Sequence, residues 1–275
     1  MKSDLRIYVL SYNRPEMLAL CLAGVCGFNR GAGEIIVFDD GSDDVRTLSL
    51  LRTFHERNLI DHYYPMPHAG IGPLRRAMLE DFCASEADQI MQVEGDMLVA
   101  PAAIVTLAQA YREIRAAGTP VAWLCTHQHD WCHSTITRLD VAGYDIGVAN
   151  SGSEPFWTAG GDYIRQNMHL LPAARPDMVL FLQRWSACTL YRPEIQVQHL
   201  GAIDSYYYPQ WTPEMVTYRN ADGSMRQPYP DVIELDFSFT RELYSALYRA
   251  YYDVLRRRWR PVELPTWKEA TGETD

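Results

Sequence analysis

Two pairs of acidic side chains stand where apolar segments of the sequence end. Glu94 and Asp96, separated by Gly95, come directly after the segment DQIMQV at 88–93. Two carboxylates one residue apart at a strand end can point toward one hard cation. Mg²⁺ or Mn²⁺ prefers such oxygen ligands and keeps positions open for phosphate oxygens. A solvated turn is the competing interpretation of this spacing.

The second pair, Asp39 and Asp40, follows the apolar segment EIIVF at 34–38. An acidic residue after the second strand of a nucleotide-binding sheet commonly accepts a hydrogen bond from a ribose hydroxyl or a base N–H. The two acidic pairs together therefore favour a nucleotide site with a divalent cation over two unrelated turns.

Alternating strand and helix patterns over the first hundred residues would bring these side chains together. The sequence predicts four strands, at residues 5–10, 34–38, 60–64 and 88–93. Between them it predicts three helices, at residues 15–26, 44–58 and 70–84. This order is typical of a parallel sheet with helices on both faces, where ligands bind at the carboxyl ends of the strands. Those ends carry Ser11-Tyr12-Asn13-Arg14, Asp39-Asp40 and Glu94-Gly95-Asp96.

The second half of the sequence is less regular. It predicts helices at 101–117 and 176–187, strands at 120–126 and 195–200, a long loop at 204–232 and a terminal helix at 238–259. There is no internal repeat and no low-complexity linker, so we expect one domain over residues 1–275. Its expected parts are a nucleotide half at 1–100, an acceptor half at 101–235 and a helical extension at 236–275.

Composition and charge exclude several classes of protein. A net charge of −10 is wrong for a protein that grips nucleic acid through bulk electrostatics, although a local basic patch could still do so. No apolar run approaches the roughly 20 residues of a membrane span, and MKSDLRIYVL lacks the pattern of a secretory signal. Six cysteines without a regular framework favour free thiols in a reducing compartment, so we expect a cytoplasmic protein.

Four ordered segments carry a resemblance to a known family: YVLSYNRPEMLALCL, EIIVFDDGSDD, HAGIGPLRRAML and MQVEGDMLVAP. They resemble the T/S-Y-N-R-P, V-D-D-G-S, glycine-loop and D-x-D elements of family 2 type glycosyltransferases with the GT-A fold. A later segment, VQHLGAIDSY, resembles the V-x-H-x-G segment of many GT-A enzymes. Two positions depart from the family pattern, because Arg76 replaces its usual asparagine and Glu94 stands first in the D-x-D motif.

The resemblance implies an α/β protein of the GT-A (Rossmann-like) type. Its mixed, mostly parallel sheet would be flanked by helices, with an irregular acceptor half and a C-terminal helix. The implied activity is transfer of a sugar from a nucleoside-diphosphate sugar, with a UDP-sugar favoured, to an acceptor. The implied transfer depends on Mn²⁺ or Mg²⁺ and inverts the anomeric carbon.

The resemblance also implies roles for individual residues. The donor-binding set that it implies is Ser11, Tyr12, Arg14, Asp39, Asp40, Arg75 and Gly95. Within this set, Asp39 should contact the base or the ribose, and Arg75 should face the nucleotide or its diphosphate. The implied metal ligands are Asp96, His199 and Glu94, and Asp96 is the more regular of the two acidic ligands. A buried structural histidine is the alternative interpretation of His199.

An inverting transfer needs a base near the acceptor hydroxyl. In the family this base is an acidic residue ahead of a helix, in an E-D-x-x-x-x-x-R pattern. Asp177 is the nearest match, with Arg184 seven residues later, but Pro176 stands where the pattern has an acid. Asp162, after Gly160 and Gly161, is the second candidate, and either Asp could instead be a helix N-cap.

Two other classes of function compete with this one. A nucleotidyltransferase of related fold lacks support, because the chain has no glycine-rich, lysine-bearing start for a triphosphate. A non-catalytic nucleotide-binding or carbohydrate-binding module would not need the paired carboxylates. The acceptor stays open: a glycan, a lipid-linked sugar, a protein, a small molecule or, less favoured by the acidic balance, a modified base in DNA.

Two further segments have open interpretations. The segment HQHDWCH at 127–133 is either an acceptor-binding loop or a zinc site of unusual spacing. The segment RELYSALYRAYYDVLRRRWR has leucine and tyrosine at helical spacing with interleaved arginines. It predicts a helix that packs on the domain or makes peripheral contact with an anionic membrane surface.

Overall fold

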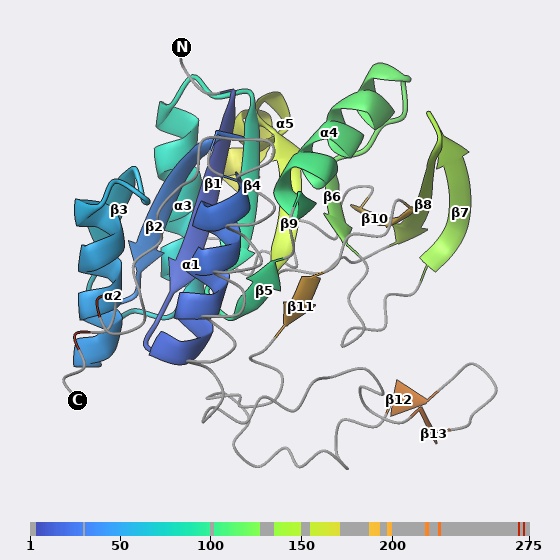
Figure 1. Ribbon diagram of the computed structural model, residues 1–275. Coiled ribbons are helices and arrows are strands. Elements are labelled where there is room, and N and C mark those ends of the chain that lie inside the picture. The colour runs from blue at the N-terminus through green and yellow to red at the C-terminus, as the bar shows by residue number, and fades with distance from the viewer. Residues whose placement is uncertain are drawn as a thin grey trace.

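A mixed sheet forms the centre of the molecule (Figure 1). The computed structural model describes residues 4–29, 31–99, 102–126, 135–149, 155–170, 187–192, 197–199, 218–219, 225–226, 269 and 272. Nine strands form the sheet in the order β3-β2-β1-β4-β9-β6-β10-β8-β7. Their bounds are β1 Leu5–Ser11, β2 Glu34–Asp39, β3 His62–Pro65, β4 Gln89–Glu94, β6 Trp123–Thr126, β7 Thr135–Val141, β8 Tyr144–Ala149, β9 Phe156–Gly160 and β10 Ala187–Arg192.

The first four strands of the sheet run parallel to one another. β1 pairs in parallel with both β2 and β4, and β2 pairs in parallel with β3. Beyond β4 the sheet is mixed, because β9 runs antiparallel to both of its neighbours, β4 and β6. The predicted α/β class, with a mixed and mostly parallel sheet flanked by helices, is confirmed.

In the described part of the chain, five α-helices cover the two faces of this sheet. They are α1 Pro15–Asn29, α2 Val45–Glu56, α3 Ile71–Ala84, α4 Ala103–Ala116 and α5 Gly161–Asn167. A 3₁₀ turn, Met168–Leu170, follows α5. Figure 1 shows α1 and α2 in front of the sheet and α3 behind it.

Alternation along the strands divides the apolar side chains between two cores. In β1, Leu5, Ile7 and Val9 pack in the cluster that contains the apolar faces of α1, α2 and α4. Tyr8 and Leu10 point the other way, into the cluster that contains α3 and α5. Successive side chains of a strand point to opposite faces, so a strand buried on both sides reads as a continuous apolar run.

Smaller pairings lie outside the main sheet. β5 (Met97–Val99) directly follows the turn after β4 and pairs antiparallel with β11 (Val197–His199). This pairing confirms the strand predicted at 195–200, which lies beside β5 and outside the main sheet. A second short pair is β12 (Tyr218–Arg219) with β13 (Met225–Arg226).

Several predicted segments lie outside the described residues. These are the helix at 176–187 except Ala187, which begins strand β10, the helix at 238–259, the segment 127–133 and most of the loop at 204–232. Near the C-terminus, Glu269 contacts α2, since its carboxylate lies 2.8 Å from the Arg57 guanidinium and its carbonyl oxygen accepts from Thr53 Oγ1.

Among the described residues, no helix is long and apolar enough to cross a membrane. The five described cysteines are free thiols.

Close packing of α1 on β5 is tested at Gly24. A Cβ atom at this position would lie 2.5 Å from the carbonyl oxygen of Val99. Gly24→Ala should therefore destabilise the protein by about 1–3 kcal/mol, although alanine is the better helix former. Urea denaturation followed by circular dichroism measures the loss. Val105→Ala, at a position 41% exposed on α4, is the control and should change stability by less than about 0.5 kcal/mol.

Candidate functional site

The carboxyl ends of β1, β2 and β4 meet at one edge of the sheet. Strand register pairs Ser11 with Asp39 and Leu10 with Glu94, so the polar residues that end these strands are neighbours. Asp39 is 1% exposed. Its Oδ1 accepts from Ser11 Oγ at 2.5 Å and from Ser42 Oγ at 2.6 Å, and its Oδ2 accepts from the Ser42 N–H at 2.9 Å. Asp39 thus ties the end of β1 to the turn after β2.

Asp40 has a different set of contacts from its neighbour. It is 4% exposed, and its carboxylate accepts from the backbone N–H groups of Ala69 and Gly70, at 2.8 and 2.9 Å. The same carboxylate lies 2.9 Å from Nδ1 of His68. Gly70 caps α3 at φ +89°, a conformation that glycine adopts readily. Asp40 therefore fixes the loop that leads into α3.

Asn13 connects the loop after β1 to the loop before α2. Its Oδ1 accepts from the N–H groups of Asp43 and Asp44, both at 3.0 Å, and its Nδ2 donates to Asp43 Oδ1 at 2.9 Å. Its backbone N–H donates to Ser42 Oγ at 2.7 Å. Asn13 and Arg14 both have positive φ, at 50° and 57°. These contacts hold the strained turn in place.

Each carboxylate of the Glu94-Gly95-Asp96 turn forms an ion pair with an arginine. Arg14 lies 3.1 Å from Asp96 Oδ2, and Arg75 of α3 lies 2.5 Å from Glu94 Oε1. All four side chains are less than one-fifth exposed. Charge-assisted pairs of this kind are strong when they are partly withdrawn from water. Two positive and two negative charges thus lie together at the end of β4.

Gly95 lets this turn pack against β1. Its N–H donates to the carbonyl oxygen of Leu10 at 2.7 Å, and a Cβ atom at Gly95 would lie 2.9 Å from the same oxygen. Behind the turn, Cys21 of α1 donates its S–H to the Glu94 carbonyl at 3.4 Å. Burial, and then the nearby charge of Asp96, raises the pKa of the Cys21 thiol. The turn therefore rests on a neutral thiol.

For His199, the third predicted metal ligand, the structure describes the position of the backbone. His199 in β11 pairs with Met97, the residue that follows Asp96, so the strand pairing brings its segment beside the acidic turn. Its side chain lies outside the described part of the structure. Among the described residues, no group of three or more His, Cys, Asp or Glu side chains is arranged to hold a metal ion. Asp177 also lies outside the described residues.

Asp162 is separate from this cluster. It lies in the first turn of α5, two residues after Gly160, and Gly160 pairs with Gln89 at the amino end of β4. Asp162 is therefore at the opposite edge of the sheet from Glu94. It forms a bidentate pair with Arg115, at 2.9 and 3.0 Å, and the hydrogen bond from Arg115 lowers the pKa of Asp162. The structure therefore does not bring Asp162 to the strand ends where Ser11, Asp39 and Glu94 meet.

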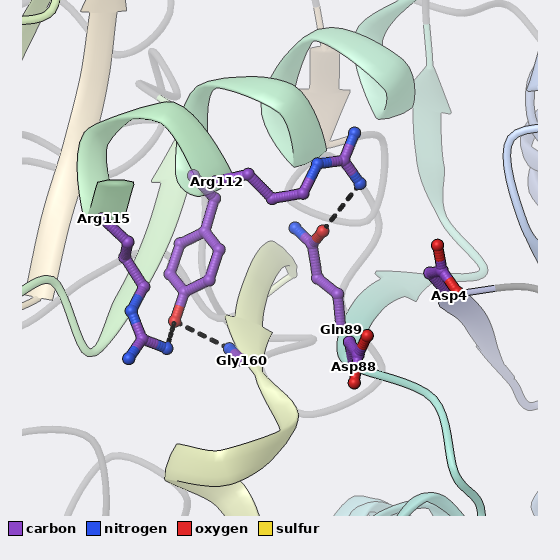
Figure 2. Close-up of a pocket in the computed structure, with 7 residues that line it drawn as sticks. Asp4, Asp88, Gln89, Arg112, Arg115 and Gly160 are labelled. Atoms are coloured by element: carbon purple, nitrogen blue, oxygen red, sulfur yellow. Dashed lines mark hydrogen bonds between the residues drawn. The ribbon is translucent and has the colours of Figure 1, made fainter. Parts of the chain in front are cut away.

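A pocket of about 450 Å³ lies at this opposite edge (Figure 2). Its lining consists of Asp4, Asp88, Gln89, Tyr111, Arg112, Arg115 and Gly160. Arg112 donates to Gln89 at 3.2 Å, and the Gly160 N–H donates to the Tyr111 hydroxyl at 2.7 Å. These contacts tie α4 to the sheet, and the pocket is distinct from the cluster at the strand ends.

Sequence reasoning missed the contributions of Ser42, Asn13 and His68 to the site. Ser42 belongs to the D-D-G-S element and Asn13 to the S-Y-N-R-P element, so both motifs contained the signal. His68 opens the segment HAGIGPLRR, and its ring stacks on that of Tyr12, with ring centroids 4.4 Å apart and an interplanar angle of 16°. The pattern of the sequence did not indicate this contact.

No protein-family model and no sequence among curated proteins matches this chain. Solved structures do match it. S. aureus TarS 1–349 has a TM-score of 0.50 at 14% identity, covering 94% of this chain and 74% of that chain. The same protein in complex with UDP-GlcNAc has a TM-score of 0.50 at 14% identity, with coverage of 98% and 69%. The mannosyltransferase PcManGT from Pyrobaculum calidifontis, in complex with GDP-Man and Mn²⁺, has a TM-score of 0.52 at 11% identity, with coverage of 97% and 78%. At these identities the similarity shows a shared fold.

The contacts of Asn13 are tested by two substitutions. Asn13→Gly keeps access to positive φ and loses the side-chain hydrogen bonds, so it should destabilise the protein by about 1–2 kcal/mol. Asn13→Ala loses the same bonds but keeps a Cβ in the left-handed region without the local hydrogen bonds that let asparagine adopt it, so it should be about 1 kcal/mol less stable than Asn13→Gly. Urea denaturation of both variants measures the order. Equal stability of the two variants would contradict the backbone argument.

The Arg115–Asp162 pair is tested by its pH dependence. The Asp162 side chain is 56% exposed, so Asp162→Asn should lower the free energy of unfolding by less than about 1 kcal/mol at pH 7. Because the folded-state pKa of Asp162 is lowered, this contribution is present above the ordinary pKa of about 3.9 and is lost as pH falls through the lower folded value. Urea midpoints of parent and variant should therefore converge below about pH 4. A difference that grows with acid would contradict the pair's role.

Proposed function

We propose that this chain, which has the GT-A-like glycosyltransferase fold, transfers a sugar from a nucleoside-diphosphate sugar to the hydroxyl group of an acceptor. The observation that carries the proposal is the meeting of Ser11, Asp39 and the two arginine–carboxylate pairs at the carboxyl ends of neighbouring parallel strands. That edge is where open α/β sheets bind nucleotides. Complexes of structurally similar proteins with UDP-GlcNAc and with GDP-Man support a donor of this class.

The base or ribose of the donor would bind beside Asp39. Oδ1 of Asp39 already accepts hydrogen bonds from the hydroxyl groups of Ser11 and Ser42, whereas Oδ2 accepts one hydrogen bond, from the Ser42 N–H. A carboxylate oxygen accepts about two hydrogen bonds, so Oδ2 has capacity for one donor from the ligand. Because Asp39 is 1% exposed, a ligand would contact only a small part of this side chain.

The diphosphate would bind near Arg14 and Arg75. Both guanidinium groups are balanced by carboxylates, so the four charges sum to zero before a ligand arrives. A nucleoside diphosphate then brings negative charge that these residues alone do not offset. The cluster therefore favours joint binding of the diphosphate and a cation.

The carboxylate oxygens of Glu94 and Asp96 are suitable ligands for Mn²⁺ or Mg²⁺ bound together with the diphosphate. Glu94 and Asp96 supply hard oxygen ligands, and Mg²⁺ is commonly bound by one or two carboxylates plus substrate phosphates. Glu94 and Asp96 would hold the cation, with His199 as the third protein ligand. When bound, a divalent cation stabilises the charge of a leaving diphosphate.

The chain's own residues would then position the reacting groups. The bond between the anomeric carbon and the diphosphate oxygen breaks, the acceptor oxygen forms the new bond to that carbon, and a carboxylate removes the acceptor proton. Arg14 and Arg75 would orient the diphosphate as the leaving group. Asp177 is the remaining candidate for the base, and its position ahead of a predicted helix is what supports it. Inversion at the anomeric carbon belongs to the same proposal.

The proposed function predicts that nucleotide and metal bind cooperatively. Calorimetric titrations with UDP, GDP, CDP and ADP, each with and without Mn²⁺, should find a nucleoside diphosphate whose affinity rises at least about tenfold with the metal. By linkage, that nucleotide should tighten Mn²⁺ binding by the same factor. Asp96→Asn should lose this coupling and keep weak binding of the nucleotide alone.

Asp162→Asn is the matched control, since it removes a carboxylate at the opposite edge of the sheet. This variant should keep the full coupling between nucleotide and Mn²⁺. The proposal fails if no nucleoside diphosphate binds the parent protein. The metal role of Asp96 fails if Asp96→Asn and the parent protein show equal coupling.

A further inference from the structure

Two aromatic rings from distant segments stack at the edge of the candidate site. Tyr12 directly follows β1, and His68 lies in the loop between β3 and α3. Their ring centroids are 4.4 Å apart and their planes differ by 16°, which is a nearly parallel stack. Both segments also contact the turn after β2: His68 contacts Asp40, and Asn13 donates to Ser42. The stack therefore lies against the turn that carries Asp39.

His68 is held in place although much of it is exposed. Its side chain is 55% exposed, yet Nδ1 lies 2.9 Å from Asp40 Oδ2 and 3.1 Å from the Asp40 carbonyl oxygen. Both of these oxygens only accept hydrogen bonds, so Nδ1 carries the hydrogen. An exposed side chain ordinarily keeps its rotamer freedom. Here a buried carboxylate and a stacked tyrosine remove that freedom from the imidazole.

The anchor of His68 also holds the backbone of the loop. The carboxylate of Asp40 accepts from the N–H groups of Ala69 and Gly70 as well as from His68. A Cβ atom at Gly41 would lie 2.6 Å from the His68 backbone nitrogen, so this part of the loop is closely packed. Moving the imidazole off Tyr12 would give up the contacts to Asp40 while the loop beneath it stayed fixed. The contacts to Asp40 and Tyr12 therefore fix the position of the imidazole ring of His68.

We propose that His68 is a base-stacking residue of the nucleotide site, with Tyr12 and His68 forming a two-ring platform and Asp40 acting as the positioning residue for it. This inference rests on the proposed function and adds a residue to it. A flat, oriented ring stack with the exposed ring of His68 on its outer side suits a nucleobase, because stacking uses the π-face that every base has. The platform contributes affinity for the base and leaves the diphosphate to the arginine–carboxylate cluster.

The test compares two substitutions of His68 by calorimetry with UDP at fixed Mn²⁺. His68→Ala removes the ring and should weaken UDP binding about tenfold, within the range measured for loss of one base–aromatic stack. His68→Phe keeps a stacking ring but loses the contacts to Asp40 that position it, so it should weaken UDP binding less than His68→Ala does, by about threefold. Binding of inorganic pyrophosphate, which has no base, should be unchanged in both variants.

A second histidine provides the matched control. His62 of β3 is also partly exposed, at 44% of its side chain, stacks on Tyr64 and lies 2.8 Å from the carboxylate of Glu34. His62→Ala should leave UDP binding unchanged. This control separates loss of a base contact from general loss of an exposed imidazole ring.

Each of the following results would overturn the inference. Tighter UDP binding by His68→Ala would mean that the imidazole occupies the place of the base. Equal weakening by His68→Ala and His68→Phe, or a parallel loss of pyrophosphate binding, would mean that the loop and not the ring matters. Unchanged UDP affinity in His68→Ala would leave the ring without a role in binding. Absence of nucleotide binding by the parent protein would sink the proposed function and this inference together.

Discussion

The buried carboxylate of Asp39 is the interaction on which the candidate site depends. It joins the end of β1, through Ser11, to the turn after β2, through Ser42. The backbone oxygen of Asp39 also accepts from the N–H of Met66 at 2.8 Å, which places the chain beyond β3 against the same point. Three consecutive strands of the parallel half are thus fastened where they end. The loops that leave this point carry Tyr12 and His68.

Charge balance is the second constraint. Glu94 and Asp96 are partly withdrawn from water, and a carboxylate in such a place is costly unless it has a partner of opposite charge. Arg14 and Arg75 supply those partners from two different elements, the turn before α1 and helix α3. The same arrangement keeps positive charge at the edge where a diphosphate would arrive. Stability without a ligand and affinity for a charged ligand therefore come from the same four side chains.

The parallel half was predictable because its signals are local. Each buried strand is a continuous apolar run that ends in a polar turn, and these runs correspond to β1, β2 and β4. The strand-end residues Ser11, Asp39 and Glu94 followed directly, since parallel strands in register place their carboxyl ends together. The motifs with the family resemblance fall on these same ends.

The roles of other residues depended on contacts that the sequence pattern does not contain. Asp39 and Asp40 are adjacent in one motif. Asp39 nevertheless accepts a hydrogen bond from Ser11 at the end of β1, whereas Asp40 accepts one from Ala69 in the loop before α3. Asp162 follows a pair of glycines, as a catalytic loop residue can. The antiparallel direction of β9 nevertheless places it at the opposite edge of the sheet. Strand direction in the mixed half is a tertiary property, set by pairing with β4 and β6.

The central claim is that the acidic turn after β4 serves the chemistry of a nucleotide sugar. The most direct measurement is slow hydrolysis of UDP-sugars and GDP-sugars without acceptor, followed by release of the nucleoside diphosphate, with Mn²⁺ present or removed by chelation. Release from at least one donor should require the metal, be lost in Asp96→Asn and persist in Asp162→Asn. Release that is independent of the metal, or that is undiminished in folded Asp96→Asn, would contradict it.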